Sequence, residues 1–404
     1  MVELLILLLV FVAIVVALNK RADVGATLIA GAVVLGLLVG RPPQALALDV
    51  WSAITSFETL RLIVIVILIL TLTEALKSAR LMESMVRALL QLINDARVVI
   101  AVVPALTGLL PMPGGAMFSA PMVEEVSHHC TVTPDQKTFA NYWFRHIWEY
   151  IMPLYPALVL CATLLALPIS AFMRNQWPLT LAAIVSGGIV VWAHFPKNST
   201  NGEHTDRRGS LLAFAGSIWP VALVVVATMA LEIDLLITLP ATFVLLALVS
   251  RFSLSQAWAV LRKGADWRIA LVLVGAMVFK EVMESTGVVE HVSEALGAAG
   301  VPPLALVAAV PFIVGLSTGI TVAAFSISVP IVLPFLMVGG SVHLPYVVLM
   351  YAGGMTGLML SPVHLCLILT REYFKSDWWK TIRPVLFAQS VVLAVAVAMA
   401  TLGS

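Results

Sequence analysis

Charged residues are scarce in this chain. Asp, Glu, Lys and Arg make up 11% of its 404 residues, whereas 61% are hydrophobic. A water-soluble domain cannot hide that much apolar surface, because its surface stays too large relative to its volume. The formal net charge of +1 argues against a nucleic-acid partner, since no face could neutralise many phosphates. The composition therefore predicts a chain embedded in a membrane, in contact with lipid.

Cysteines and short catalytic motifs are also few. The three cysteines, Cys130, Cys161 and Cys366, form no Cys-x-x-Cys pair and no disulfide framework, which favours small apolar packing residues. His128 and His129 precede Cys130, but neighbouring histidines on a helix point apart and no fourth metal ligand is near. There is no phosphate-binding loop, Gly-x-Ser-x-Gly elbow or His-Glu-x-x-His pair, which argues against an ATP-driven pump and against an enzyme.

Long hydrophobic runs are abundant instead. Runs of about 18 or more apolar residues, enough to cross a bilayer, recur along the chain. The first run is expected to be an uncleaved helix, because Glu3 replaces a basic leader segment and no small-x-small cleavage site precedes Asn19. The predicted plain helices are 3–19, 24–41, 60–78, 178–195, 211–230, 233–250, 268–284 and 382–402, with an amphipathic surface stretch at 79–94.

Short matches recur between the two halves of the chain at one constant offset. Glu74 and Glu281 each lie near the end of an apolar run. The segment Val-Pro104-Ala-Leu-Thr-Gly-Leu matches Val-Pro311-Phe-Ile-Val-Gly-Leu, and the two segments are as far apart in the sequence as the two glutamates. Their common order predicts an internal duplication. The expected repeats are 1–195 and 211–404, joined by a polar linker at 196–210. Their scaffold helices would lie within 3–78 and 211–284.

Prolines and glycines interrupt four of the hydrophobic segments. A straight helix cannot run through Pro111, Pro113 and the Gly114-Gly115 pair, and irregular backbone must be buried in protein or line a cavity. Segments 98–127 and 302–337 are therefore predicted to be re-entrant hairpins. Segments 139–166 and 346–370 are predicted to be broken helices.

Basic residues support this layout. With two hairpins, each repeat crosses the membrane five times, so the second repeat is inverted and the all-α protein has about ten transmembrane helices. Eighteen of the 23 Lys and Arg then lie on one side, Lys280 and Arg145 fall within helices, and the other side receives only Arg41, Arg61 and Arg174. The positive-inside rule makes the basic side cytoplasmic. The expected location is the inner membrane, with both termini in the periplasm.

Inverted repeats with broken helices are typical of secondary transporters, whose helix ends bind anions and whose freed carbonyls bind Na⁺. At the second hairpin tip, the hydroxyls of Ser317, Thr318 and Thr321 beside Gly319 suit Na⁺, although such residues also serve as packing glue between helices. The first tip offers Pro113–Gly115 carbonyls and Ser119.

Ionisable residues within the membrane by default indicate function. Arg145 and Glu149 are four residues apart and His146 and Glu149 three, so each pair could meet on a helix. Arg145 could equally snorkel towards the cytoplasm. His364 follows Ser361-Pro362 in the matching break. The candidate substrate- and ion-binding residues are Pro113, Gly114, Gly115, Ser119, His146, Glu149, Tyr150, Ser317, Thr318, Gly319, Thr321, Ser361, Pro362 and His364.

The segment Pro111-Met-Pro-Gly-Gly-Ala-Met-Phe-Ser-Ala-Pro-Met122 resembles the integral-membrane family DUF401. The resemblance implies membership of the ion transporter superfamily, which includes dicarboxylate, citrate, gluconate and arsenite carriers, and a homodimeric elevator transporter. The sodium-coupled dicarboxylate branch carries Ser-Asn-Thr at both hairpin tips. Neither tip here contains asparagine, so dicarboxylate specificity and its two-sodium site do not transfer.

The sequence thus predicts a secondary transporter for a small organic anion, driven by a Na⁺ or H⁺ gradient and needing no other cofactor. His146, Glu149 and His364 are candidates for proton coupling. A cation/proton antiporter is the close alternative, with Glu149 as its acid. An intramembrane enzyme acting on lipid, using His146 and Glu149 as acid and base, and a structural membrane protein are less consistent with paired hairpins.

Overall fold

The computed structural model describes residues 2–20, 22–112, 114–127, 131–197, 206–288, 291 and 302–403. The described part is helical except for loops and one antiparallel hairpin, β1 (Met337–Val338) with β2 (Ser341–Val342). Before residue 197 the helices are α1 (Val2–Asn19), α2 (Val24–Leu38), α3 (Pro43–Thr55), α4 (Phe57–Ser78), α5 (Leu81–Leu90), α6 (Ala96–Thr107), α7 (Ala116–Ser127), α8 (Pro134–His146), α9 (Pro156–Leu164) and α10 (Ile169–His194).

After residue 206 the helices are α11 (Arg207–Met229), α12 (Leu235–Val249), α13 (Leu254–Gly264), α14 (Trp267–Thr286), α16 (Pro303–Thr318), α17 (Thr321–Leu336), α18 (Leu344–Leu360), α19 (Leu365–Phe374) and α20 (Trp378–Leu402). Among the described residues, α1, α4, α10, α11, the α18–α19 stretch and α20 are long and apolar enough to cross a membrane. The chain is therefore an all-α, multi-pass membrane protein.

Two short helices lie where the sequence analysis assigns none. They are α3 and α13, which follow the second helix of each set. A search for long apolar runs passes over both because each is short. Ser253 and Gln256 form a capping box at the start of α13, a signal that does predict this helix. Helix α10 also begins at Ile169, well before the expected residue 178, and carries Pro178 inside it. Neighbouring helices allow a membrane helix to tolerate such a proline.

The helices after residue 206 follow the same order as those before residue 197. The starts of α6 and α16, at Ala96 and Pro303, are separated by the same offset as the short sequence matches. The starts of α7 and α17, and those of α10 and α20, keep nearly the same separation. The order of the helices and the order of the sequence matches therefore agree.

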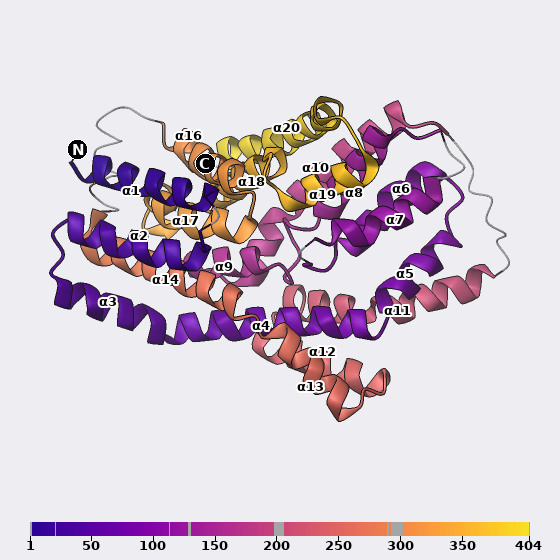
Figure 1. Cartoon of the computed structure of the whole chain (residues 1–404), viewed down its shortest axis with the longest axis horizontal. Coiled ribbons are helices and arrows are strands. Elements are labelled where there is room, and N and C mark those ends of the chain that lie inside the picture. The colour runs from indigo at the N-terminus through magenta and orange to yellow at the C-terminus, as the bar shows by residue number, and fades with distance from the viewer. Residues whose placement is uncertain are drawn as a thin grey trace.

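Helices from the first half of the chain pack against helices from the second half. Helix α4 packs against α12 and α13, while α14 packs against α2 and α3. Figure 1 shows α4 running across the molecule, with α12 and α13 against one side of it and α2, α3 and α14 grouped beyond one end. Gly25 and Gly275 bring α2 and α14 into close contact, because a Cβ on Gly275 would lie 2.7 Å from the carbonyl oxygen of Gly25. Small residues at such a crossing let two membrane helices pack tightly.

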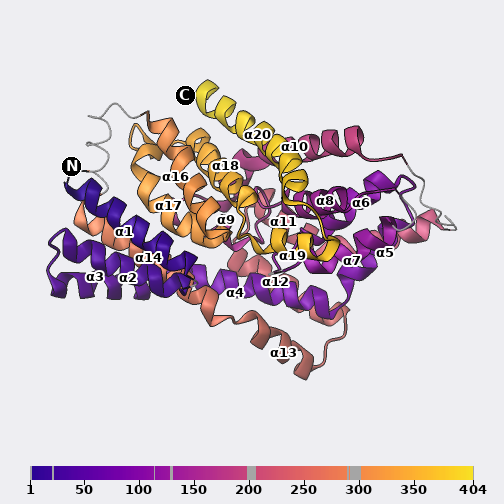
Figure 2. The ribbon, with the colours of Figure 1, turned by 45° about the horizontal axis from the view of Figure 1, so that its top comes forward.

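The interrupted segments lie together at the centre of the molecule. Helix α6 packs on α8 and α16 on α18, while α7 contacts α19 and α17 contacts α9. Both views place α8, α9 and α19 between the outer groups of helices (Figure 2). The loops between α6 and α7, α8 and α9, α16 and α17, and α18 and α19 surround a single cavity.

Candidate functional site

The central cavity has a volume of about 330 Å³. Each of the four loops contributes to its wall, as do apolar side chains of the outer helices α2, α4 and α14. The residues that carry polar or structural features at this wall are Gly114, Arg145, His146, Glu149, Tyr155, Gly319, Thr321, His364 and Cys366.

Arg145 is the only Lys or Arg in the described lining of this cavity. It lies in the last turn of α8 and is 2% exposed. Its Nη2 donates to the carbonyl oxygen of Met112 at 2.8 Å, and its Nη1 lies 3.9 Å from Sγ of Cys366. Its buried Nε has no hydrogen-bond partner among the residues that the structure describes. The salt bridges among the described residues include none to Arg145. A buried guanidinium without a carboxylate leaves its charge open to a ligand.

The sequence analysis expected Arg145 and Glu149 to share a helix face. Helix α8 ends at His146, so the two residues are not one helical turn apart and the regular i,i+4 spacing does not apply. His146 and Glu149 do approach, with Nε2 and Oε1 separated by 3.7 Å. The end of the helix therefore leaves Arg145 facing the cavity rather than paired along the chain.

Three helix N-termini border the cavity. They belong to α9, α17 and α19, which begin at Pro156, Thr321 and Leu365. None has a side-chain cap, although Ser, Thr or Asp caps begin α2, α4, α6, α8, α11, α12, α13, α14 and α20. Uncapped N-termini present free N–H groups and the positive end of the helix dipole. This arrangement attracts anions.

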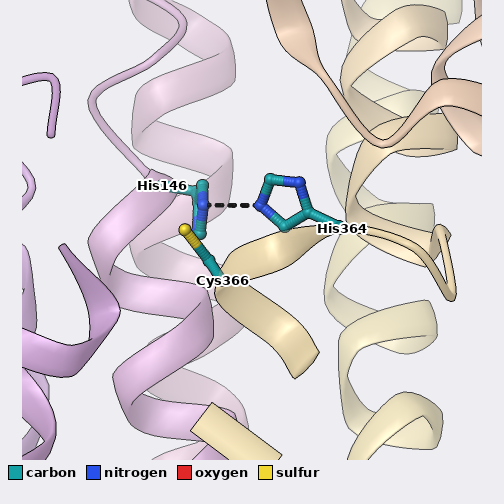
Figure 3. A group of neighbouring side chains, drawn as sticks. All are labelled: His146, His364 and Cys366. Atoms are coloured by element: carbon teal, nitrogen blue, oxygen red, sulfur yellow. Dashed lines mark hydrogen bonds between the residues drawn. The ribbon is translucent and has the colours of Figure 1, made fainter. Parts of the chain in front are cut away.

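Two histidines from distant parts of the chain meet beside the cavity (Figure 3). Nε2 of His146 lies 3.1 Å from Nε2 of His364. Nδ1 of His146 bonds the carbonyl oxygen of Tyr142 at 2.6 Å, and Nδ1 of His364 bonds that of Gly319 at 2.7 Å. Glu149, which approaches Nε2 of His146, extends this polar chain. Its Oε2 accepts a hydrogen bond from the Thr321 hydroxyl at 3.4 Å.

Glycines allow this close arrangement at two positions. Gly319 ends α16 in the left-handed region, with φ of +63°, and a Cβ there would lie 2.9 Å from the backbone nitrogen of His364. Gly108, at the end of α6, lets the helix pack on the backbone of α8, since its Cβ would lie 2.1 Å from the carbonyl oxygen of Arg145. Gly315, which matches Gly108 in the repeated sequence, packs in the same way on the carbonyl oxygen of Gly354.

The cavity brings together only part of the predicted site. Its lining includes six of the predicted residues: Gly114, His146, Glu149, Gly319, Thr321 and His364. Gly115 lies just behind this lining, against the guanidinium of Arg145. Pro113 lies outside the described residues, as do His128, His129 and Cys130.

The other predicted residues lie outside the described lining and bond elsewhere. Ser119 donates to Asn141, Tyr150 bonds Gln389, Thr318 donates to the carbonyl oxygen of Val314, and Ser361 donates to that of Leu316. Ser317 is half-buried and Pro362 is exposed at the turn between α18 and α19.

Arg145 and Cys366 line the cavity but were not in the predicted set. Arg145 was weighed as either functional or structural, and Cys366 was interpreted as packing. The sequence signal that could have assigned Cys366 to the site was its position two residues after His364. Its nearness to His146 comes only from the fold, because the two residues belong to opposite halves of the chain.

A further cavity of about 450 Å³ lies between α4, α10 and α12. It is lined by the carboxylates Glu58, Glu232 and Asp234, and its single arginine, Arg61, is already paired with Asp234. This negative lining suits an anion poorly. The smaller central cavity is therefore the better candidate for a functional site.

A family model described as "Protein of unknown function (DUF401)" matches residues 3–403. No curated protein matches the chain.

Proposed function

The chain belongs to the DUF401 family, whose function is unknown, and from its site we propose that it is a secondary transporter of a small organic anion. The observation that carries the proposal is Arg145, a buried cation that faces the cavity and has no carboxylate partner among the described residues. The substrate supplies the missing carboxylate. The uncapped N-termini of α9, α17 and α19 add backbone donors and positive dipole ends around the same space.

The size and lining of the cavity narrow the substrate class. Its volume of about 330 Å³ is at the small end of ligand pockets, which begin at about 300 Å³. Its one arginine matches one carboxylate, and a bidentate guanidinium–carboxylate pair would fix the orientation of the ligand. The rest of the wall includes Val24, Leu70, Ile269 and Val272, which favour an apolar body. A small monocarboxylate fits these features best.

The proposed mechanism is alternating access by an elevator motion. The recurring helix order supports two inverted repeats, 1–195 and 211–404, with re-entrant hairpins at 98–127 and 302–337. Broken helices around a central site are the usual design of secondary transporters. The hairpins and broken helices would move with the substrate, against scaffold helices that also form a homodimer. Both termini would face the periplasm.

Coupling to a Na⁺ or H⁺ gradient supplies the energy in this proposal. For Na⁺, oxygen ligands are available near the end of α16, at Ser317, Thr318 and Thr321. Glu149 would be the acid of a cation/proton antiporter, which is the competing function. Neither the anion transporter nor the cation/proton antiporter needs an enzyme active site or a further cofactor.

The first experiment is ligand-dependent thermal stability of the purified protein. The panel contains monocarboxylates of increasing size, di- and tricarboxylates, sugar acids and phosphonates, each with and without Na⁺ at two pH values. A ligand that binds the folded state raises its apparent melting temperature by mass action. We expect small monocarboxylates to give the largest shift, and Arg145→Gln to abolish it.

Uptake of the best ligand into proteoliposomes, under an imposed Na⁺ or pH gradient, then tests transport. A response to Na⁺, Li⁺ or pH with every anion silent would favour the antiporter and contradict the proposal. Binding of an anion that is then chemically altered would instead indicate an enzyme.

A further inference from the structure

We propose that His146, His364 and Cys366 form a binding site for a transition-metal ion of the Zn²⁺ class at the edge of the central cavity. Their ligand atoms lie within 4.8 Å of one another, and all three side chains are buried. Figure 3 shows His146 on one segment facing His364 and Cys366 on another. The proposal does not rest on anion binding, although Arg145 lies beside both sites.

The backbone fixes the protonation of both imidazole rings. A carbonyl oxygen only accepts hydrogen bonds, so Nδ1 of His146 must donate to Tyr142 and Nδ1 of His364 must donate to Gly319. In neutral rings this leaves both Nε2 atoms as lone-pair acceptors. They face each other at 3.1 Å. Two lone pairs at that distance repel each other unless a cation lies between them.

The spacing fits a metal ion. With Zn–N bonds of about 2.0–2.1 Å, two nitrogen ligands on a tetrahedral ion lie about 3.3 Å apart, close to the separation of the two Nε2 atoms. A nitrogen and a sulfur ligand lie about 3.6 Å apart, so Cys366 Sγ, now within 4.8 Å of both nitrogens, must approach by at most about 1.2 Å. Metal-ligating histidines usually donate their other N–H to a backbone carbonyl or carboxylate, as both do here.

The third ligand distinguishes a metal ion from a shared proton. A proton between His146 and His364 needs only those two bases, whereas Sγ of Cys366 also lies within 4.8 Å of both ligand nitrogens. Arg145 Nη1 lies 3.9 Å from that sulfur, and its charge stabilises the thiolate that a metal requires. Binding releases the thiol proton.

Glu149 supplies a carboxylate beside this set. Its Oε1 lies 3.7 Å from Nε2 of His146, but it does not belong to the group of ligand atoms that all lie within 4.8 Å of one another, so its role here is to balance charge. A divalent ion, one thiolate and one carboxylate together carry no net charge, which suits a buried site. Arg145 then remains the unbalanced cation beside the ion.

Metal binding by the full-length protein in detergent tests the site without any anion present. His128, His129 and Cys130 offer the same ligand types elsewhere, so the reference protein carries His128→Gln, His129→Gln and Cys130→Ser. After chelator treatment, calorimetric titration with Zn²⁺ is expected to show one equivalent bound. Cys366→Ser and His364→Gln should each weaken binding by more than about 100-fold, exceeding the loss of about 10- to 100-fold that is usual for outer-shell partners. Cys161→Ser and His194→Gln are the matched controls and should bind as the reference does.

Co²⁺ provides the second measurement, because thiolate ligation gives an intense near-ultraviolet charge-transfer band. The band is expected in the reference protein and should be absent in Cys366→Ser. A band that the reference protein shows and Cys161→Ser keeps assigns the thiolate to Cys366, even if Cys366→Ser fails to fold. No Zn²⁺ binding, binding unchanged by Cys366→Ser, or Co²⁺ bound without the band would each overturn the proposal. Absence of any metal binding would assign a shared proton to the histidine pair.

Discussion

The guanidinium of Arg145 occupies the space that a side chain at Gly115 would need. A Cβ built on Gly115 would lie 2.1 Å from Nη2 of Arg145, while that same nitrogen donates to Met112 at 2.8 Å. The absence of a side chain at Gly115 therefore sets the position of the only Lys or Arg in the described cavity lining.

Gly115→Ala is expected to displace the guanidinium without unfolding the protein, because the colliding atom is the end of a long side chain. The affinity for the transported anion should fall by about 10-fold or more, the equivalent of roughly 1.4 kcal/mol. Anion titrations followed by thermal stability measure this change. Gly188→Ala is the control, since no described atom lies within 4 Å of its Cβ, and it should leave binding intact. Unchanged affinity in Gly115→Ala would contradict the role of Arg145.

Two substitutions of Arg145 distinguish the contribution of its positive charge to anion binding from that of its planar geometry. Arg145→Gln should abolish anion binding, because no other Lys or Arg lines the described cavity. Arg145→Lys should retain weak binding, since the charge persists but the planar, bidentate geometry is lost. The protein should remain folded in both variants, because no carboxylate in the described part of the chain forms a salt bridge with Arg145. A large drop in melting temperature for Arg145→Gln, with anion binding preserved, would indicate a structural cation instead.

Gly108→Ala tests the contact between α6 and α8. The added Cβ would lie 2.1 Å from a backbone carbonyl oxygen of Arg145, which cannot rotate away as a side chain can. We expect a loss of about 1–3 kcal/mol, the usual cost of overpacking, measured as a lower melting temperature in detergent. Gly315→Ala should behave similarly, because its Cβ would lie 2.5 Å from the carbonyl oxygen of Gly354. Full stability in both variants would contradict the close backbone packing.

Gly319→Ala distinguishes backbone strain from collision with His364. The left-handed conformation alone costs a residue with a Cβ about 1–2 kcal/mol. Gly40 also has a positive φ, but no atom of the described residues lies within 4 Å of its Cβ, so Gly40→Ala measures strain alone. Gly319→Ala should be less stable than Gly40→Ala, because its Cβ also meets the backbone of His364. Equal melting temperatures would mean that the loop moves aside at no cost.

The two halves of the chain are expected to need each other. When residues 1–197 and 206–404 are co-expressed as separate chains, a tag on the first half should capture the second, because α2 packs on α14 and α4 on α12. Gly275→Leu should prevent capture, since even a Cβ there meets the backbone of α2. Gly216→Leu is the control, because nothing lies near its Cβ. A first half that purifies alone as a single stable species would argue against this packing of helices between the two halves.

The sequence predicted the places where helices stop better than it predicted the site. Pro111 and the Gly114-Gly115 pair break a helix through local geometry, and α6 and α7 end and begin around them. Gly319 acts in the same way between α16 and α17. These effects depend on neighbouring residues alone, which is why a sequence reveals them.

The site depends on contacts between distant residues. Ser361 and Thr318 follow the expected pattern of small hydroxyls at a break, but their hydroxyls bond backbone carbonyls. Cys366 looked like packing because nothing near it in sequence gives it a partner beyond His364. Whether Arg145 pairs with Glu149 depends on where α8 ends, and the sequence between them gives no clear stop.

The contact between α2 and α14 has a consequence for the timing of synthesis. Helix α2 ends at Leu38 and α14 begins only at Trp267, so more than half of the chain is made between them. At translation rates of about 5–20 residues per second, α2 waits about 10–50 s for its partner to be made. During that interval Gly25 and the rest of the tight crossing face lipid or other proteins. The yield of intact protein should then depend on translation speed and on membrane proteases, as well as on the stability of the finished fold.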